Sequence, residues 1–143
     1  MSTTLTDPNC PYCVKGDMVA KFAYPICEMN SGFLYVFKEQ SKYGRIVLAY
    51  KDHASEITDL TEEERNAFID DVAKAAAAVH KAFHPDKVNY GAYGDTLGHL
   101  HFHIVPKYKD GDEWGGTFQM NPGKVFLTDE QYEEIAQKIR DNL

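Results

Sequence analysis

The sequence predicts an α+β fold with a mainly antiparallel, five-stranded sheet, one long helix and a second helix at the C-terminus. Two observations lead to this prediction. Apolar, strand-like segments follow one another in pairs joined by short turns, instead of alternating with helices as in parallel sheets. Two further segments open with helix-capping sequences and carry apolar residues at helical spacing. The 143 residues suit a single domain, 1–143, with its core at about 10–106 and a C-terminal loop and helix at 107–143.

The first half of the chain supplies the first strands of the expected sheet. Residues 10–18 precede them and have an irregular or short helical character. Phe22–Glu28 and Phe33–Lys38 are rich in apolar residues, and Asn30-Ser31-Gly32 between them has the composition of a turn. The next segment, Arg45–Tyr50, is apolar enough to form a buried strand.

Two helices and a second strand pair complete the prediction. Thr61-Glu62-Glu63-Glu64 is a capping box, and a helix of about 22 residues is expected behind it. Its apolar stripe consists of Phe68, Val72, Ala75, Ala76, Val79 and Phe83. Val88–Tyr93 and His99–Pro106 are then expected as strands joined by a glycine-containing turn. Thr128-Asp129-Glu130-Gln131 is a second capping box, ahead of an amphipathic C-terminal helix.

Composition narrows the class of protein. Apolar and charged fractions of 43% and 26% are those of a soluble globular domain, and no stretch approaches the roughly 20 apolar residues of a membrane span. A net charge of −7 argues against general nucleic-acid binding, although a small phosphate ligand remains compatible with it. The N-terminus, Met1–Asp7, has no basic or apolar run, so we expect a cytoplasmic protein. In that compartment the three cysteines favour metal binding or redox chemistry over a disulfide.

Three histidines alternate with apolar residues in the segment His99-Leu100-His101-Phe102-His103. In a strand, side chains at i, i+2 and i+4 share a face, so the imidazoles form one row. The first and third would lie about 13 Å apart at roughly 3.3 Å per residue, whereas Zn–N bonds are only about 2.0–2.1 Å long. A single ion cannot easily bind all three on a straight strand, so at least one imidazole is free for other chemistry. A catalytic metal held by part of the row stays open as an alternative.

A neutral imidazole can be a nucleophile that forms a covalent intermediate. One ring nitrogen must then face the electrophile while the other donates a hydrogen bond that fixes the tautomer. The preceding segment, residues 91–98, supplies glycines that allow close backbone approach and the hydroxyl of Thr96. It is a candidate phosphate cradle, or merely a hairpin turn.

The segment Gly98–Pro106 resembles the histidine-triad (HIT) family pattern His-φ-His-φ-His-φ-φ, where φ is apolar. The order of the other features agrees from about Cys10 to Pro106, and includes Lys51-Asp52-His53 after the third strand. The resemblance implies a HIT-like fold and a nucleotide hydrolase that works through a nucleotidyl-histidine intermediate. The third triad residue here is a histidine. In this respect the chain resembles the hydrolase branches of the family rather than the galactose-1-phosphate uridylyltransferase branch.

The resemblance also implies roles for particular residues. His101 matches the nucleophile, and His103 and Thr96 match positions that contact the α-phosphate. The substrate-binding positions that it implies are Asn89 for the phosphate or leaving group, Gly94 and Asp95 in the loop, and Glu39 for the ribose. Asp95 departs from relatives that carry Gln there, and a carboxylate repels a phosphate unless it is protonated, paired or turned away.

The pair Cys10-Pro11-Tyr12-Cys13 has two functional interpretations. It has the form of a glutaredoxin redox motif, but no strand precedes it and no βαβ pattern follows. Two thiolates can instead join two histidines in a tetrahedral zinc site. In zinc-containing HIT proteins the partners match His53 and His99, which implies a structural Zn²⁺ and leaves His101 and His103 for the phosphate.

The function predicted from the sequence is therefore hydrolysis at the α-phosphate of a purine nucleotide, either a phosphoramidate or a dinucleoside polyphosphate, with release of a nucleoside monophosphate. The purine preference and a homodimer are implied by the resemblance alone. The alternative from another class is a nucleotide-binding regulatory module of the same fold that turns over slowly or not at all.

Overall fold

The computed structural model describes residues 6–143 of the chain, so most of the N-terminal stretch Met1–Asp7 lies outside the described residues. The described part contains an antiparallel sheet, two long helices and three short helical segments. The elements are α1 (Pro11–Val14), α2 (Gly16–Ala20), β1 (Ala23–Glu28), β2 (Gly32–Phe37), β3 (Ile46–Tyr50), η1 (Ile57–Asp59), α3 (Glu62–Phe83), β4 (Lys87–Gly91), β5 (His101–Lys107) and α4 (Asp129–Asp141).

The sheet has five strands in the order β1-β2-β3-β5-β4, and every neighbouring pair is antiparallel. The predicted α+β class and the five-stranded antiparallel sheet are therefore confirmed. β5 carries His101 and His103 and lies between β3 and β4, where His103 pairs with Val47 on one side and Gly91 on the other. The histidine strand is thus an interior strand, held by backbone hydrogen bonds along both edges.

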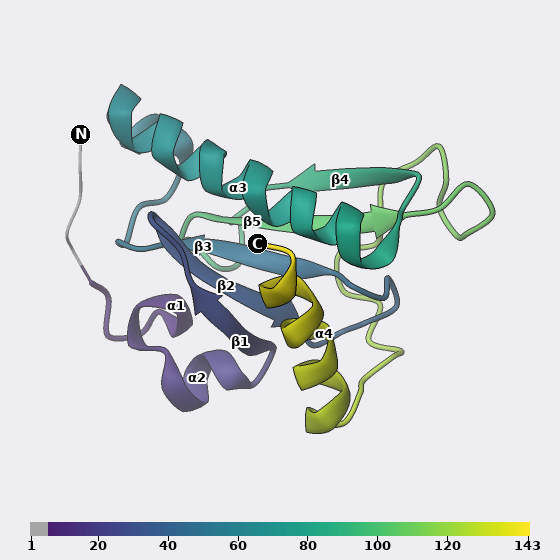
Figure 1. Cartoon of the computed structure of the whole chain (residues 1–143). Coiled ribbons are helices and arrows are strands. Elements are labelled where there is room, and N and C mark those ends of the chain that lie inside the picture. The colour runs from purple at the N-terminus through teal and green to yellow at the C-terminus, as the bar shows by residue number, and fades with distance from the viewer. Residues whose placement is uncertain (1–5) are drawn as a thin grey trace.

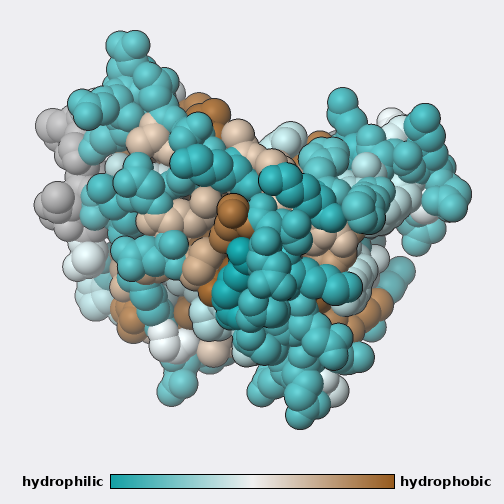
Figure 2. Space-filling view, in the orientation of Figure 1, coloured by the Kyte–Doolittle hydropathy of each residue, from teal (hydrophilic) through white to brown (hydrophobic). Residues whose placement is uncertain are grey.

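Both long helices cover the same face of the sheet, as Figure 1 shows for α3 and α4. Each begins with the predicted capping box: Thr61 accepts from the N–H of Glu64, and Thr128 accepts from the N–H of Gln131. Their apolar stripes pack with the inward residues of β2, β3 and β5 into the main core. Figure 2 shows this side of the molecule as mainly hydrophilic, with smaller hydrophobic areas between, because the helices turn their polar faces outward.

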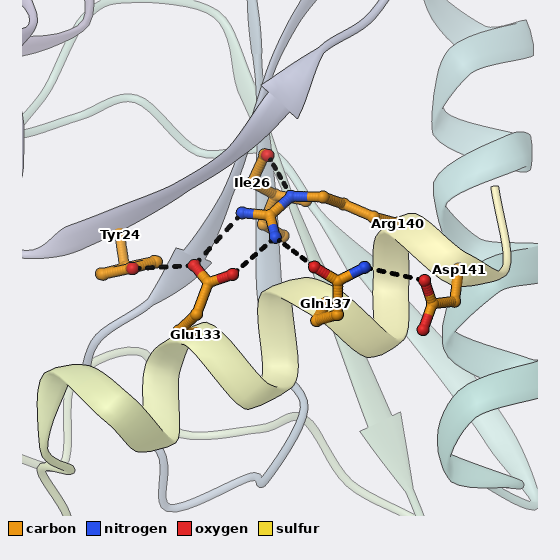
Figure 3. A network of polar contacts seen from close by, with 6 residues as sticks. All are labelled: Tyr24, Ile26, Glu133, Gln137, Arg140 and Asp141. Atoms are coloured by element: carbon orange, nitrogen blue, oxygen red, sulfur yellow. Dashed lines mark hydrogen bonds and ion pairs between the residues drawn. The ribbon is translucent and has the colours of Figure 1, made fainter.

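A polar network fastens α4 to β1, at the edge of the sheet (Figure 3). The Arg140 guanidinium pairs with the Glu133 carboxylate at 2.7 Å and donates to the carbonyl of Ile26 at 2.8 Å. The Tyr24 hydroxyl donates to the same carboxylate at 2.8 Å. The charges of Arg140 and Glu133 therefore compensate each other within the chain.

The opposite face of the sheet carries a second, smaller core. Tyr35 on β2 and Val47 and Ala49 on β3 pack there against Tyr12 and Val19 from α1 and α2. This cluster covers only part of the face, so the histidine side chains of β5 lie at its margin. No helix among residues 6–143 is both long enough and apolar enough to cross a membrane.

Two predicted strand boundaries are wrong in an instructive way. The histidine strand begins at His101 and not at His99, because the N–H of Leu100 donates to the carbonyl of Ala54, outside the sheet. The preceding strand ends at Gly91 and not at Tyr93, because the Tyr93 ring folds back over Gly91, where a Cβ atom would lie 2.5 Å from it. The chain between these points forms a loop beside the histidines.

Candidate active site and metal site

Four side chains from three parts of the chain converge at a candidate metal site. Cys10 and Cys13 flank the start of α1, His53 follows β3, and His99 precedes β5. The Nδ1 atom of His99 lies 3.4 Å from both sulfur atoms, and the Nδ1 atom of His53 lies 3.3 Å from Cys13 Sγ. All four possible ligand atoms lie within 4.8 Å of one another. This Cys₂His₂ set is the one that the resemblance implied, and its donors could hold a metal ion.

The backbone fixes which nitrogen of His99 faces the sulfur atoms. Its Nε2 atom lies 2.7 Å from the carbonyl oxygen of Tyr50, which can only accept, so Nε2 carries the proton. Burial lowers the pKa of His99 to about 4, which keeps the ring neutral. Its Nδ1 therefore presents a lone pair to the cluster, as metal ligation requires.

His101 has the opposite orientation. Its Nδ1 atom lies 2.6 Å from the carbonyl oxygen of His99, so Nδ1 donates and Nε2 keeps its lone pair. Burial lowers the pKa of His101, and the residue is only 8% exposed. The Tyr12 ring supports the imidazole with centroids 5.1 Å apart. His101 is thus a neutral imidazole in a single tautomer.

His103 lies next in the row, with its ring centroid 5.2 Å from that of His101. Its Nδ1 atom is 3.0 Å from Nη2 of Arg45. Burial lowers its pKa to about 3, and the neighbouring Arg45 charge acts in the same direction. The rings of Phe37 and Phe118 lie near the His103 ring, at 5.2 and 6.4 Å between centroids.

A cavity of about 440 Å³ opens beside the row. It is bounded by the loop after β4, by His101 and His103, and by a segment that precedes α4. Its lining residues are Tyr93, Gly94, Asp95, Thr96, Leu97, His101, His103, Thr117, Phe118 and Met120. Five predicted site residues, namely Gly94, Asp95, Thr96, His101 and His103, are therefore brought together. Gly94 has a φ of +80°, which a residue with a side chain rarely adopts.

The two other predicted substrate residues lie elsewhere. Glu39 is buried, and its carboxylate accepts hydrogen bonds from the backbone N–H groups of Ser41, Lys124 and Val125. Burial opposes its ionisation, but these bonds outweigh burial and hold the pKa of Glu39 below its usual range. Asn89 lines a separate hollow with Lys107 and does not border the histidine cavity.

The sequence interpretation missed Arg45 and the role of Tyr12 between the cysteines. Arg45 precedes an otherwise apolar strand, and that isolated charge was the available signal.

The histidine row bends away from a straight line, because His99 leaves the strand for the cysteines. Among residues 6–143 the potential metal ligands gather at the cysteines and not along the row. The glutaredoxin interpretation does not fit this fold, because the cysteines begin a short helix that no strand precedes within the part of the chain described from residue 6 onward.

Comparisons with known proteins identify the family of the chain. The sequence model of the HIT domain matches residues 34–110, more than half of the chain. "Protein hit" of Bacillus subtilis (strain 168) is 25% identical over 118 residues, which are 78% of this chain and 79% of that protein.

Solved structures show the same fold. A histidine triad protein from Sinorhizobium meliloti 1021 aligns with a TM-score of 0.81 at 19% identity, over 90% of this chain and 95% of that one. A Zn-bound histidine triad family protein from Mycobacterium smegmatis aligns with a TM-score of 0.67 at 20% identity, over 93% and 94% of the two chains. The chain belongs to the HIT domain family.

Proposed function

We propose that this HIT protein is a nucleotide hydrolase that cleaves at the α-phosphate of purine nucleoside phosphoramidates or dinucleoside polyphosphates. It releases a nucleoside monophosphate through a nucleotidyl intermediate on His101. The observation that carries this proposal is the tautomer of His101. Its Nδ1 donates to the His99 carbonyl at 2.6 Å, and its Nε2 lone pair remains for the substrate.

In the first step, Nε2 of His101 forms a bond to the α-phosphorus, and the bond from phosphorus to the leaving nitrogen or oxygen breaks. The leaving group departs with the electron pair and takes up a proton. The imidazole becomes positively charged as the new bond forms. Its hydrogen bond to the His99 carbonyl then becomes charge-assisted, which strengthens it and stabilises the intermediate.

Donors around the cavity stabilise the phosphoryl oxygens. The Thr96 hydroxyl, the backbone near Gly94 and the ring of His103 border the same space as His101. One preorganised donor can contribute about 10²–10³-fold to the rate. Asp95 also borders this space and is exposed, so its carboxylate can turn toward solvent when a phosphate binds.

In the second step, the oxygen of a water molecule forms a bond to phosphorus and the bond from phosphorus to Nε2 breaks. The electron pair returns to the imidazole, the water loses a proton, and the nucleoside monophosphate leaves. The two displacements restore His101 to its starting tautomer. We leave Glu39 outside the substrate site because its carboxylate already binds the backbone of the C-terminal segment.

We assign Zn²⁺ to the Cys₂His₂ cluster, with a structural role. In a tetrahedral site with Zn–S about 2.3 Å and Zn–N about 2.0–2.1 Å, a sulfur and a nitrogen ligand lie about 3.5 Å apart. In this structure, three of the four possible sulfur–nitrogen pairs lie 3.3–3.4 Å apart. A bound ion would hold His99 in place, and with it the carbonyl oxygen that orients His101.

The purine preference and a homodimeric state are part of the proposal on the ground of family membership. Binding measurements with AMP, GMP and CMP test the first. Light scattering of the purified protein tests the second. Equal affinity for all three nucleotides would remove the purine preference, and a monomer would remove the homodimer. Either result would leave the chemistry of His101 as proposed.

The experiment that tests the function is intact-protein mass spectrometry of samples quenched during turnover of an AMP-phosphoramidate. Wild-type protein should carry an adenylyl adduct, and His101→Ala protein should carry none and release no AMP. An adduct that persists in His101→Ala contradicts the assignment. Tight AMP binding without turnover by the wild type would instead support the alternative, a nucleotide-binding regulatory module.

A further inference from the structure

Arg45 is a buried cation directly behind the histidine row. It precedes β3 and is 1% exposed. Because Val47 pairs with His103, Arg45 lies on the same face of the sheet as the histidines. Arginine is almost never fully buried unless it is paired, so its surroundings call for an explanation.

No carboxylate bonds to this guanidinium among residues 6–143. Nη2 contacts His103 Nδ1 at 3.0 Å and the sulfur of Met120 at 3.2 Å, and Nη1 donates to the carbonyl of Gln119 at 3.5 Å. The rings of Phe37 and Phe118 lie 4.2 and 5.0 Å from the guanidinium carbon. The Nε atom is the one buried side-chain nitrogen or oxygen of the described residues that has no hydrogen-bond partner.

The charge is nevertheless retained at neutral pH. Burial lowers the pKa of Arg45 to about 10, and the more distant Glu39 carboxylate opposes that shift. A buried charge without a close counterion is costly, and an anionic ligand beside it would relieve the cost. The cavity lined by His103 is the adjoining space that such a ligand can enter.

The contact with His103 has only one possible direction. A guanidinium has donors and no acceptor, so His103 Nδ1 must accept. Because burial and the Arg45 charge both disfavour protonation of this ring, the proton of the neutral imidazole lies on Nε2. His103 is therefore a hydrogen-bond donor at Nε2, whereas His101 offers a lone pair at Nε2. Two identical side chains thus acquire complementary roles from the groups behind them.

We infer that Arg45 is a positioning residue that holds His103 in its Nε2–H tautomer, and that its uncompensated charge favours an anionic ligand in the cavity. This catalytic role rests on the proposed function, in which the ligand is the α-phosphate. The phosphate then accepts a hydrogen bond from the Nε2–H group of His103. Arg45 acts through His103 and has no contact with the reacting atoms.

A purely structural role for Arg45 predicts a different outcome. Its bonds to Gln119 and Met120 also fasten the segment before α4 over the cavity. If that were its whole role, another substitution that loosens the segment would change the tautomer of His103 in the same way as loss of Arg45. Phe118→Ala provides this control, because it removes the ring that packs on the segment side and leaves Arg45 beside His103.

The decisive measurement is the nitrogen chemical shifts of the His103 ring by two-bond ¹H–¹⁵N NMR at neutral pH. Wild type, Arg45→Lys and Phe118→Ala should show protonated Nε2 and unprotonated Nδ1. Arg45→Met should show averaging between the two tautomers. A wild-type ring protonated at Nδ1, or Arg45→Met with an unchanged tautomer, overturns the inference. The wild-type spectrum alone is informative even if a variant fails to fold, and it does not depend on turnover.

Binding and kinetics complete the test. Arg45→Met should bind AMP about tenfold more weakly, because both the buried positive charge and the group that orients the His103 donor are lost. Its kcat should fall more than its KM rises, because the lost donor acts on the developing phosphoryl charge. Arg45→Lys should recover part of both, and Arg140→Met should change neither. Unchanged AMP affinity in Arg45→Met refutes the charge role, whatever substrate the protein turns over.

Discussion

The two faces of the sheet are both largely buried, but they are buried by different chemistry. Under α3 and α4, side chains such as Leu48 and Ile104 form an apolar core whose members need no hydrogen-bond partners. On the other face, His99, His101 and His103 are buried as polar groups, and each needs a partner. The first face therefore explains stability, and the second holds the candidate functional site.

Two arginines, one on each face, show this difference clearly. Arg140 on the helix side meets a carboxylate, which raises its pKa (Figure 3). Arg45 on the histidine side meets an imidazole, a sulfur and a carbonyl, and one of its nitrogens has no partner. The chain completes the first network by itself, whereas the guanidinium of the second has no carboxylate bonded to it among residues 6–143.

The largest expected effect compares two residues of the same strand that face opposite ways. His101→Ala should lower kcat/KM by about 10⁴ or more, as loss of a nucleophile does, with a nearly unchanged free energy of unfolding. Ile104→Ala should cost about 2–5 kcal/mol of unfolding free energy and leave kcat nearly unchanged. Steady-state kinetics and urea unfolding of both variants check this. A stable, fully active His101→Ala protein would end the assignment of chemistry to that face.

The metal site offers a second contrast, between Cys13 in the cluster and the half-buried Cys27 outside it. Cys13→Ser should lose most of its bound metal and several kcal/mol of stability, because metal binding contributes to folding free energy. It should also lose activity, since His99 then no longer fixes the carbonyl that orients His101. Cys27→Ser should keep its metal and its activity. Elemental analysis with thermal unfolding measures these outcomes, and full metal content in Cys13→Ser would contradict the site.

Glu39 is a buried charge that, unlike Arg45, finds all its partners within the chain. Its pKa is below the ordinary 4.5 in the folded state, so its stabilisation is present above pH 4.5 and is lost as the pH falls through the folded value. Glu39→Gln should therefore cost roughly 1–3 kcal/mol at pH 7 and progressively less below pH 4.5. Urea unfolding across this range is the measurement. An equal loss of unfolding free energy at every pH would show that the charge of Glu39 does not contribute to stability.

The smallest expected effect concerns the helix side alone. Thr128→Ala removes the N-cap acceptor of α4 and should cost about 1 kcal/mol without changing kcat. Thr61→Ala at α3 is the matched variant, because its hydroxyl accepts the equivalent N–H at the same 3.2 Å. Thermal unfolding should show similar losses in both. A fall in kcat from either variant would mean that the two faces are coupled through the helices.

Much of this architecture could be predicted from the sequence because the signals are local. Apolar periodicity and the two capping boxes determine the type and start of each helix, and the capping threonines occupy the predicted positions. Alternation along His101–Ile104 determines which side chains share a face of β5. The Cys-x-x-Cys spacing, together with the family pattern, indicated the four residues of the metal cluster.

Other features arose only from tertiary structure, because they depend on contacts between distant segments. His99 leaves the strand because one ring nitrogen binds the carbonyl of Tyr50, the last residue of β3, and the other faces the cysteine pair at α1. The carboxylate of Glu39 binds residues that lie 85 and 86 positions away. Arg45 reaches His103 across 58 positions, and this contact determines which histidine nitrogen can donate. Sequence spacing cannot specify a hydrogen-bond direction, since that depends on which acceptor the folded chain places at each nitrogen.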